Sequence, residues 1–222
     1  MAIIEKYNEK GIKIYHGDCM EAMALMPDKA FELAIVDVPY GIGRDGQIKT
    51  TGNHGGRKAY PFKEWDKNPP SQEYFTELFR ISGHQIIWGA NYITRYLPSS
   101  MGWIFWDKGQ RIAQSDGELA FTSFERALRV YKCNRVALLI EGTIHPTQKP
   151  VKLYEWLLTN YAKSGDRILD THLGSGSIAI ACDNLGFELT AYELDEEYVD
   201  GAVKRLIEHR KQLKIFDNDI WR

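Results

Sequence analysis

Short apolar runs alternate with segments of helical periodicity along most of the chain. Runs rich in β-branched and aromatic residues predict strands at 11–15, 31–36, 84–88, 102–106, 118–122, 127–131, 167–169 and 187–193. Apolar residues at helical spacing predict helices at 19–26, 71–82, 92–97, 151–161, 177–185 and 196–213. Strands that alternate with helices in this way are typical of an α/β protein, with helices on both faces of a largely parallel sheet.

The composition is that of an ordinary globular chain. Hydrophobic residues make up 44% and charged residues 26% of 222 residues, a length that suits one large domain, 1–222. There is no 20-residue apolar run and no signal-peptide pattern, so we expect a cytoplasmic protein without a membrane partner. Three widely spaced cysteines without a CxxC pair argue against disulfides and against a structural zinc site, and we expect no metal.

One long segment, 41–70, lacks hydrophobic periodicity. It carries four glycines between 46 and 56, and six basic residues face three acidic ones between 44 and 67. We therefore predict a mobile loop with local positive charge, although the formal net charge of the chain is −2. Its basic residues could contact DNA phosphates or could be solvated surface charges.

The stretch ILDTHLGSGSIAIA, 168–181, predicts a strand, a glycine turn and a helix. Gly174 and Gly176 would bring backbone close to a ligand at the helix N-terminus, and Glu193 could accept hydrogen bonds from ribose. With Ala179 in the third small position, the spacing also fits the dinucleotide fingerprint. This loop alone therefore indicates a nicotinamide cofactor, an adenosyl cofactor or only a tight turn.

The position of the glycine loop favours a rearranged chain order. Only one helix and a short tail follow its strand–helix–strand unit, so the neighbouring strands must come from earlier segments. If strand 11–15 pairs with strand 187–193, the chain is circularly permuted, and the residues His16 to Asp18 lie beside the glycine loop. Asp18 could then bond an adenine amino group, or it could cap the helix that follows.

Five motifs in a fixed order carry a resemblance to a known family. HGDC, DVPYG, HPTQKP, LDTHLGSGS and AYELD follow one another between about Ile12 and Leu206, over nearly the whole chain. This order resembles the permuted beta group of amino-methylating DNA methyltransferases, and in particular its short solitary or phage-type members. The departures are Val38, where the family usually has proline, and Thr171-His172, where it usually has proline and phenylalanine.

The resemblance implies a fold, a cofactor and a set of contacts. The implied fold is a Rossmann-like, seven-stranded, mostly parallel sheet in permuted order, and the implied methyl donor is S-adenosylmethionine. Thr147 and Lys149 would reach the carboxylate of the cofactor, because lysine suits an anion. The implied cofactor-binding residues are Asp18, Cys19, Asp37, Thr147, Lys149, Asp170, His172, Gly174, Ser175, Gly176, Ser177, Glu193 and Leu194.

The residues Asp37, Pro39 and Tyr40 offer what amine methylation requires. The lone pair of an adenine N6 amine is delocalised into the ring, so two hydrogen-bond acceptors would be needed to localise it and aim it at the methyl group. The Asp37 carboxylate and the main-chain carbonyl beside Pro39 could be these acceptors, and Tyr40 could stack on an extruded base. On local sequence alone, the same residues predict only a turn.

We therefore expect a site-specific DNA methyltransferase that acts on adenine N6 of a flipped-out base, with Asp37, Pro39 and Tyr40 as catalytic residues. Aspartate rather than serine at position 37 favours adenine, and cytosine N4 is the nearest alternative. A nicotinamide-dependent oxidoreductase and a noncatalytic DNA-binding protein are less favoured functions. The resemblance also implies DNA, a cognate restriction enzyme and a second copy of the chain as partners.

DNA contacts are the least specific of these predictions. The segment 108–143 is a short candidate region for target recognition, and each basic residue in it could equally be a solvated charge. The basic candidates are Arg111, Arg126, Arg129, Lys132 and Arg135. The aromatic residues of two predicted strands are expected in the core; they are Trp88, Trp103, Phe105 and Trp106.

Overall fold

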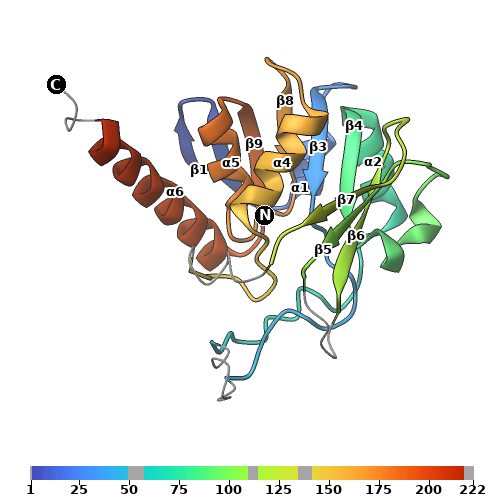
Figure 1. The fold of residues 1–222 in the computed structure, drawn as a ribbon, viewed down its shortest axis with the longest axis horizontal. Helices are drawn as coiled ribbons and strands as arrows, with labels where there is room; N and C mark the ends of the chain where they lie inside the picture. Colours follow the sequence, from blue (N-terminus) through green and yellow to red (C-terminus); the bar gives the residue numbers. More distant parts are fainter. Residues whose placement is uncertain (1, 50–57, 110–114, 135–141, 218–222) are drawn as a thin grey trace.

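A nine-stranded sheet forms the centre of the computed structural model, which describes residues 2–49, 58–109, 115–134 and 142–217. The strand order is β1-β2-β9-β8-β3-β4-β6-β5-β7 (Figure 1). The strands are β1 Ile4–Glu9, β2 Ile12–His16, β3 Phe31–Val36, β4 Ser82–Trp88, β5 Trp103–Asp107, β6 Gly117–Thr122, β7 Arg129–Lys132, β8 Arg167–Asp170 and β9 Glu188–Glu193. The helices are α1 Cys19–Met23, α2 Gln72–Ile81, α4 Val151–Tyr161, α5 Ser177–Leu185 and α6 Glu196–Asp217, with 3₁₀ turns η1 Ala90–Tyr92 and η2 Thr94–Tyr96.

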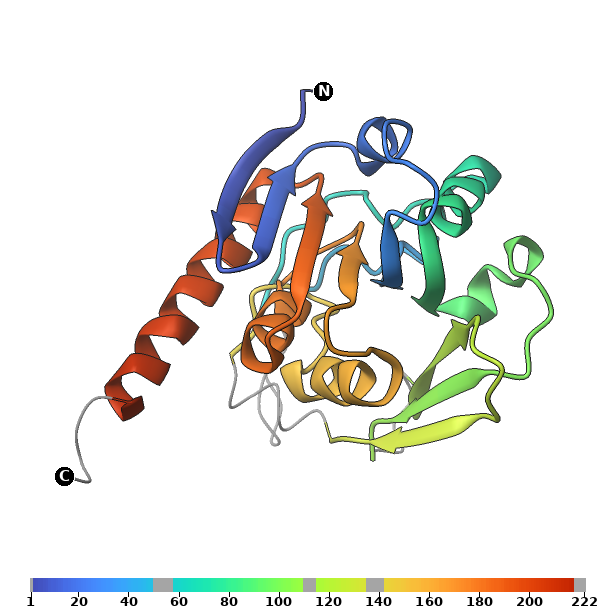
Figure 2. The same ribbon diagram turned by 90° about the horizontal axis from the view of Figure 1, so that it is seen from above.

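Helices cover both faces of the sheet, as the sequence predicts. Seen from above, α1 and α2 lie on one face and α4 and α5 on the other, with α6 beside β1 and β2 (Figure 2). The buried strand β3 supplies apolar side chains to both layers, because successive residues point to opposite faces. Leu33 and Ile35 join the core cluster that contains α4 and α5, and Ala34 and Val36 join the cluster that contains α1 and α2.

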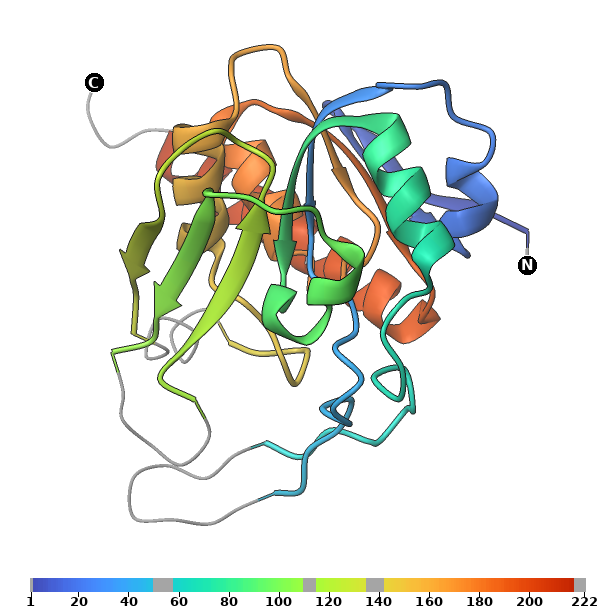
Figure 3. The same cartoon turned by 90° about the vertical axis from the view of Figure 1, so that its right-hand side faces the viewer.

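The predicted permutation is confirmed. β2 pairs in parallel with β9, so that His16 lies opposite Glu193. The strands β2, β9, β8, β3 and β4 are all parallel, and their carboxyl ends therefore meet at one edge of the sheet. The described parts of the loop 41–70 extend beyond this edge (Figure 3), where open α/β sheets bind their ligands.

The sheet has nine strands where the resemblance implied seven. The additional edge strand β1 forms an antiparallel hairpin with β2 through Lys10 and Gly11, both at positive φ. The sequence did not reveal β1 because, of its six residues, only Tyr7 is buried. At the other side, the segment 108–143 contributes β6 and β7 to the sheet itself, and β6 runs antiparallel to its two neighbours.

The other predicted elements differ from the structure only at their ends, apart from the helix predicted at 92–97. That segment forms parts of two 3₁₀ turns, η1 and η2, instead of one helix. Within the described residues, no helix is long and apolar enough to cross a membrane.

Candidate active site

A cavity of about 1100 Å³ lies at the carboxyl edge of the parallel strands. Residues of all five motifs line it, and most of the predicted site residues are therefore brought together. Those that line the cavity are Asp18, Cys19, Asp37, Pro39, Tyr40, Thr147, Lys149, His172, Gly174, Ser175, Glu193 and Leu194. Asp170, Gly176 and Ser177 are buried behind this lining.

Two residues of the glycine loop have left-handed backbone conformations. Gly174 and Gly176 have φ of 53° and 72°, which side chains other than glycine rarely adopt. A Cβ at Gly176 would also lie 2.8 Å from the Cβ of Ala202 on α6. Gly174 lines the cavity without a side chain, so a ligand can approach its backbone closely, whereas Gly176 lets the loop pack closely against α6.

Glu193 fastens the glycine loop to the end of β9. Its Oε2 accepts from the N–H of Gly174 at 2.7 Å, and its Oε1 accepts from the N–H groups of Leu194 and Asp195 at 2.9 and 3.0 Å. Burial raises the pKa of the Glu193 carboxyl, and these backbone donors oppose the rise. The N–H of Gly17 donates to the carbonyl of Glu193 at 3.0 Å, which places the end of β2 beside the glycine loop as predicted.

Asp18 caps α1, one of the two roles that its sequence position allowed. Its Oδ1 accepts from the N–H of Met20 at 2.8 Å. The neighbouring Cys19 is buried, and burial raises the pKa of its thiol to about 12. The thiol is therefore protonated at neutral pH and is not a nucleophile.

The carboxylate of Asp37 is at the centre of a cluster of charged side chains. The hydroxyl of Tyr40 donates to its Oδ1 at 2.6 Å, and the Lys149 ammonium donates to its Oδ2. Lys149 also lies 3.1 Å from Oε2 of Glu118, whose Oε1 accepts from Lys108 at 2.5 Å. The ammonium of Lys149 therefore faces two carboxylates, whereas the resemblance placed it on the carboxylate of the cofactor.

The charged neighbours in this cluster shift the pKa of each of its members. Burial raises the pKa of Asp37, and the single ammonium of Lys149 opposes this rise only in part. Burial acts on Glu118 in the same direction, but Lys149 and Lys108 together hold its pKa at about 2. Burial alone would lower the pKa of Lys149, but the Asp37 and Glu118 carboxylates raise it.

Glu118 could not be identified from the sequence. It is the first charged residue of a predicted strand, ELAFT, and no motif or spacing distinguishes it from an ordinary solvated acid. Only the antiparallel pairing of β6 with β4 and β5 places its carboxylate beside Lys149.

Asp66 supports the loop that follows β3. It is only 2% exposed, and its Oδ1 accepts from the N–H groups of Tyr40 and Gly41 at 2.6 and 2.9 Å. Its Oδ2 accepts from the N–H of Arg44 at 2.7 Å. Val38 is buried in the core with 3% exposure. These contacts hold the backbone of the DVPYG turn in place without the second proline that the family usually has.

HPTQKP forms a compact segment over the glycine loop. Nδ1 of His145 accepts a hydrogen bond from the N–H of Thr147 at 3.3 Å, so the ring proton of the neutral imidazole lies on Nε2. Of the ring atoms, Nε2 lies closest to Gly174, at 3.7 Å from the position that a Cβ of this residue would occupy. Burial lowers the pKa of His145 to about 3. The imidazole is therefore neutral, and His145 is a site residue that the sequence indicated only as part of its motif.

The described part of the basic loop packs onto the protein. Lys63 pairs with Asp195 at 2.8 Å and with Glu197 at 2.7 Å, and Lys58 donates to the carbonyl of Thr143 at 3.3 Å. Of the candidate DNA contacts, Arg126 donates to the carbonyl of Asn160 at 2.6 Å. Arg129 and Lys132 are exposed on β7, and Arg111 and Arg135 lie outside the described residues.

The predicted core aromatic residues divide into two groups. Trp88 and Trp106 are fully buried, as expected, and Trp103 packs partly buried against the core. Phe105 lines the cavity. The ring of Tyr40 stacks on the ring of Tyr92 with centroids 5.3 Å apart and planes at 14°. Tyr92 is half exposed, so the stack lies at the mouth of the cavity.

The cavity fits an adenosyl cofactor together with a second group. Single-ligand pockets usually measure about 300–1,000 Å³, and this one is larger at about 1100 Å³. The glycine cradle and Glu193 lie at one end, and Asp37 and Tyr40 lie at the other. His172 lines the wall between them, and burial lowers its pKa to about 4, so its ring is neutral.

Comparisons with known proteins agree with this arrangement. A family model described as DNA methylase, of the N6/N4 methyltransferases, matches residues 98–204. The Type II methyltransferase M.HinfI of Haemophilus influenzae is 24% identical over 97% of this chain and 73% of its own length. M.HpaI of Haemophilus parainfluenzae is also 24% identical, over 85% of this chain and 72% of its own length.

Solved structures share the fold. M1.HpyAVI in complex with SAM has a TM-score of 0.56 and 21% identity over 88% of this chain and 98% of its own. The cytosine-N4-specific PvuII DNA methyltransferase has a TM-score of 0.61 and 12% identity over 93% of this chain and 91% of its own. The relatives and the family model favour methyl transfer over nicotinamide chemistry. The chain is therefore similar to the amino-methylating N6/N4 DNA methyltransferases, and this similarity supports methyl transfer with S-adenosylmethionine as the methyl donor.

Proposed function

We propose that this protein methylates adenine at N6 in DNA. The observation that carries the proposal is a largely buried carboxylate, Asp37, whose side chain is 19% exposed, in the cavity that also contains the glycine loop. A carboxylate is a stronger hydrogen-bond acceptor than a serine hydroxyl, and an N6 amine with a delocalised lone pair needs strong acceptors. Aspartate rather than serine at this position is our reason for preferring adenine over cytosine.

We propose that the cofactor-binding residues hold S-adenosylmethionine in a fixed orientation through hydrogen bonds. Glu193 uses three of its roughly four lone-pair directions for backbone donors, and we assign the remaining one to a ribose hydroxyl. Oδ2 of Asp18 is the atom that we assign to the adenine amino group of the cofactor. S-adenosylmethionine supplies an electrophilic methyl group on a sulfonium.

The target amine would lie between Asp37 and the backbone beside Pro39. The Asp37 carboxylate and a main-chain carbonyl would each accept one amine hydrogen, which directs the nitrogen lone pair at the methyl carbon. Because burial raises the pKa of Asp37, its carboxylate is suited to take up the proton that the nitrogen loses. Tyr40 would present its ring to the extruded base, in the place where it now stacks on Tyr92.

DNA would approach the edge of the sheet at which the cavity opens. The target base must leave the duplex to reach Asp37, because its amine is inside the duplex and the Asp37 side chain is only 19% exposed. We propose that exposed basic residues of the segment 108–143, such as Arg129 and Lys132, contact the phosphates. A cognate restriction enzyme and a homodimer remain proposals that rest on the resemblance.

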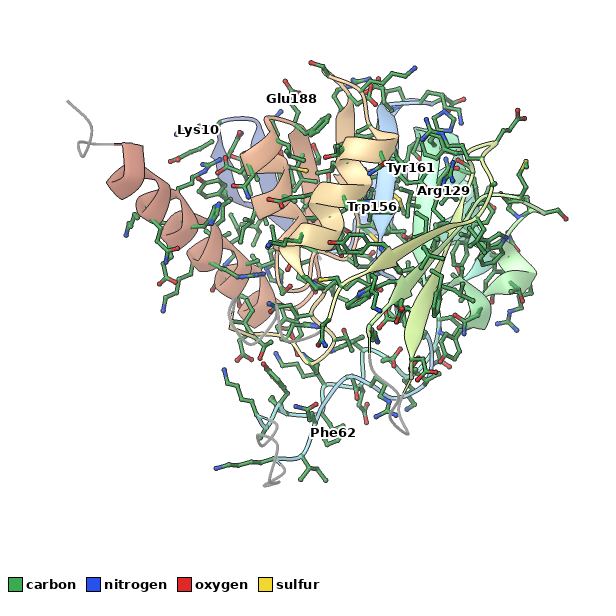
Figure 4. All side chains as sticks on the ribbon, viewed as in Figure 1. Lys10, Phe62, Arg129, Trp156, Tyr161 and Glu188 are labelled. Carbon is green, nitrogen blue, oxygen red and sulfur yellow. The ribbon has the colours of Figure 1, made fainter. Side chains whose placement is uncertain are left out.

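The test is transfer of labelled methyl groups to unmethylated DNA, followed by digestion to nucleosides. We expect N6-methyl-2′-deoxyadenosine, and we expect Asp37→Asn to lower the rate by a factor of about 100 or more. Glu188→Gln is the matched control, because Glu188 is exposed at the end of the sheet opposite to the loop that carries Phe62 (Figure 4). A digest whose only methylated nucleoside is N4-methyl-2′-deoxycytidine would replace adenine by cytosine as the target base.

A further inference from the structure

Both oxygens of the proposed acceptor Asp37 already have donors. Oδ1 accepts from the Tyr40 hydroxyl at 2.6 Å, and Oδ2 accepts from the Lys149 ammonium. Lys149 is almost fully buried, with a side chain that is 2% exposed, so water does not compete for this ion pair. A target amine that binds to Asp37 must therefore either displace one of these donors or share the carboxylate with it.

Lys149 is the donor whose displacement would help the reaction. The amine nitrogen becomes positively charged as its bond to the methyl carbon forms, and an ammonium on the same carboxylate repels that charge. It also withdraws electron density from the acceptor that must polarise the amine. The hydroxyl of Tyr40 is neutral and carries neither penalty.

A second carboxylate lies within reach of the displaced ammonium. Oε2 of Glu118 is 3.1 Å from Lys149 Nζ and 3.5 Å from the Tyr40 hydroxyl. Its other oxygen, Oε1, is held by Lys108 at 2.5 Å, which fixes the position of the side chain. When Lys149 moves to Glu118, Asp37 keeps the Tyr40 hydroxyl and gains the amine that becomes positively charged, so neither carboxylate is left without a donor.

We propose that Glu118 is a positioning residue for methyl transfer, which takes the Lys149 ammonium from Asp37 when the target base enters. Glu118 does not touch the reacting atoms. It acts by freeing Oδ2 of Asp37 for the amine. The inference rests on the proposed function, because it assigns Asp37 to the target amine.

Several titratable groups surround Lys149 and take part in its pH response. From the elements packed around it, they are Asp37 and Tyr40 after β3, Glu118 on β6, Lys108 after β5, Tyr154 on α4, Asp170 at the end of β8 and His145 on its own segment. Its two nearest carboxylates raise the pKa of Lys149, so at neutral pH the ammonium is charged and needs a partner. Removal of one carboxylate lowers the pKa of Lys149, so the ammonium loses its proton at a lower pH than in the wild type.

The test compares Glu118→Gln with Glu125→Gln, an exposed acid just after β6. We expect Glu118→Gln to lower kcat about tenfold or more and to leave the Kd for S-adenosylmethionine, measured by calorimetry, within twofold. The ratio of the variant rate to the wild-type rate should rise from pH 7 to pH 10, because loss of the Lys149 proton releases Asp37. Glu118→Asp, which keeps the charge, should restore part of the rate, and it replaces Glu118→Gln if that variant does not fold.

A double-mutant cycle separates positioning from a merely structural role. With Lys149→Gln there is no ammonium to relocate, so adding Glu118→Gln should change kcat by less than twofold. A tenfold loss that persists in the Lys149→Gln background, or a rate ratio that is flat with pH, overturns the proposal. If the wild type transfers methyl groups and Glu118→Gln has the same kcat, only this inference is wrong. If the wild type transfers no methyl groups, the proposed function is wrong and this inference is wrong with it.

Discussion

At the scale of single residues, the pKa values of three carboxylates in and behind the cavity differ because the carboxylates have different neighbours. Glu118 contacts two ammonium groups and has a pKa of about 2, whereas Asp37 contacts one and its pKa is raised by burial. Asp170 is also fully buried, and burial raises its pKa to about 8 because its main stabilising contact is one backbone N–H, from His172 at 2.9 Å. The ammonium groups and hydrogen-bond donors around each carboxylate therefore decide how far they offset the effect of burial on its pKa.

Asp170 should make the folding stability depend on pH. Its folded pKa of about 8 exceeds the ordinary value of 3.8, so its contribution to stability is complete below pH 3.8 and is lost as the pH rises through 8. Asp170→Asn does not titrate, so its free energy of unfolding relative to wild type should rise by about 1–3 kcal/mol between pH 5 and pH 9. Urea denaturation of the cofactor-free protein measures this difference, with the exposed Asp200→Asn as control. Parallel stability curves for Asp170→Asn and wild type would contradict it.

The sequence predicted the residues that belong to local motifs and missed those that act through tertiary contacts. Asp37, Gly174 and Glu193 were identified because each follows a strand end, and strand ends are visible in the hydrophobic pattern. Glu118 and Asp66 were not, because each meets its partners only after segments far apart in sequence have packed together. The contacts of Lys149 with Asp37 and Glu118 were not foreseen for the same reason, and its contact with the carboxylate of the cofactor stays a prediction.

At the scale of elements, glycine has a different function at the two ends of α5. Gly176 before the helix and Gly186 after it both have positive φ, at 72° and 74°. A Cβ at Gly176 would lie 2.8 Å from Ala202 on α6, whereas a Cβ at Gly186 would have no neighbour within 4 Å. Gly176 therefore sets the distance between α5 and α6, in addition to forming the turn.

Alanine substitutions at these two positions separate backbone strain from packing. Both variants carry the cost of a left-handed alanine, about 1–2 kcal/mol. Gly176→Ala should be destabilised by a further 1–3 kcal/mol or so, because the new methyl group overpacks the contact with Ala202. It should also bind S-adenosylmethionine more weakly, whereas Gly186→Ala should bind it normally. Equal free energies of unfolding for the two variants would show that the contact with α6 is unimportant.

The elements themselves were largely predictable, because most helices and strands bury a regular apolar face. α4 and α5 match their predicted bounds, and β3 matches at both ends. The edge strand β1 has no such face, and its existence depends on backbone pairing with β2. The number of strands could therefore not be deduced from the hydrophobic pattern.

At the scale of the whole molecule, the described segment 58–70 contacts the protein at two distant places in the chain. Asp66 binds the backbone after β3, and Lys63 binds Asp195 and Glu197 at the start of α6. Lys63 also lies 4.3 Å from the ring centroid of Tyr198. The described part of this loop therefore crosses the cavity from the acceptor site to the glycine loop.

Loss of the Lys63 contacts should affect ligand release more than stability. Lys63→Met removes ion pairs that are partly solvent-exposed, so the free energy of unfolding should change by less than about 1 kcal/mol. The dissociation rate of S-adenosylmethionine, followed by stopped-flow competition, should rise several-fold because the loop is no longer fastened over the cavity. Lys67→Met, an exposed lysine of the same loop, is the control. Identical dissociation rates for the two variants would contradict this role.

The most direct test of the central claim is sequencing that detects modified bases in DNA from cells that express the protein. Cells with the wild type should carry 6-methyladenine at one recurring sequence, and cells with Asp37→Asn should not. The same reads give the recognition context of the modified base. Modified cytosine in place of adenine, or adenine methylation that persists with Asp37→Asn, would contradict the assignment of Asp37 as the acceptor for an adenine amine.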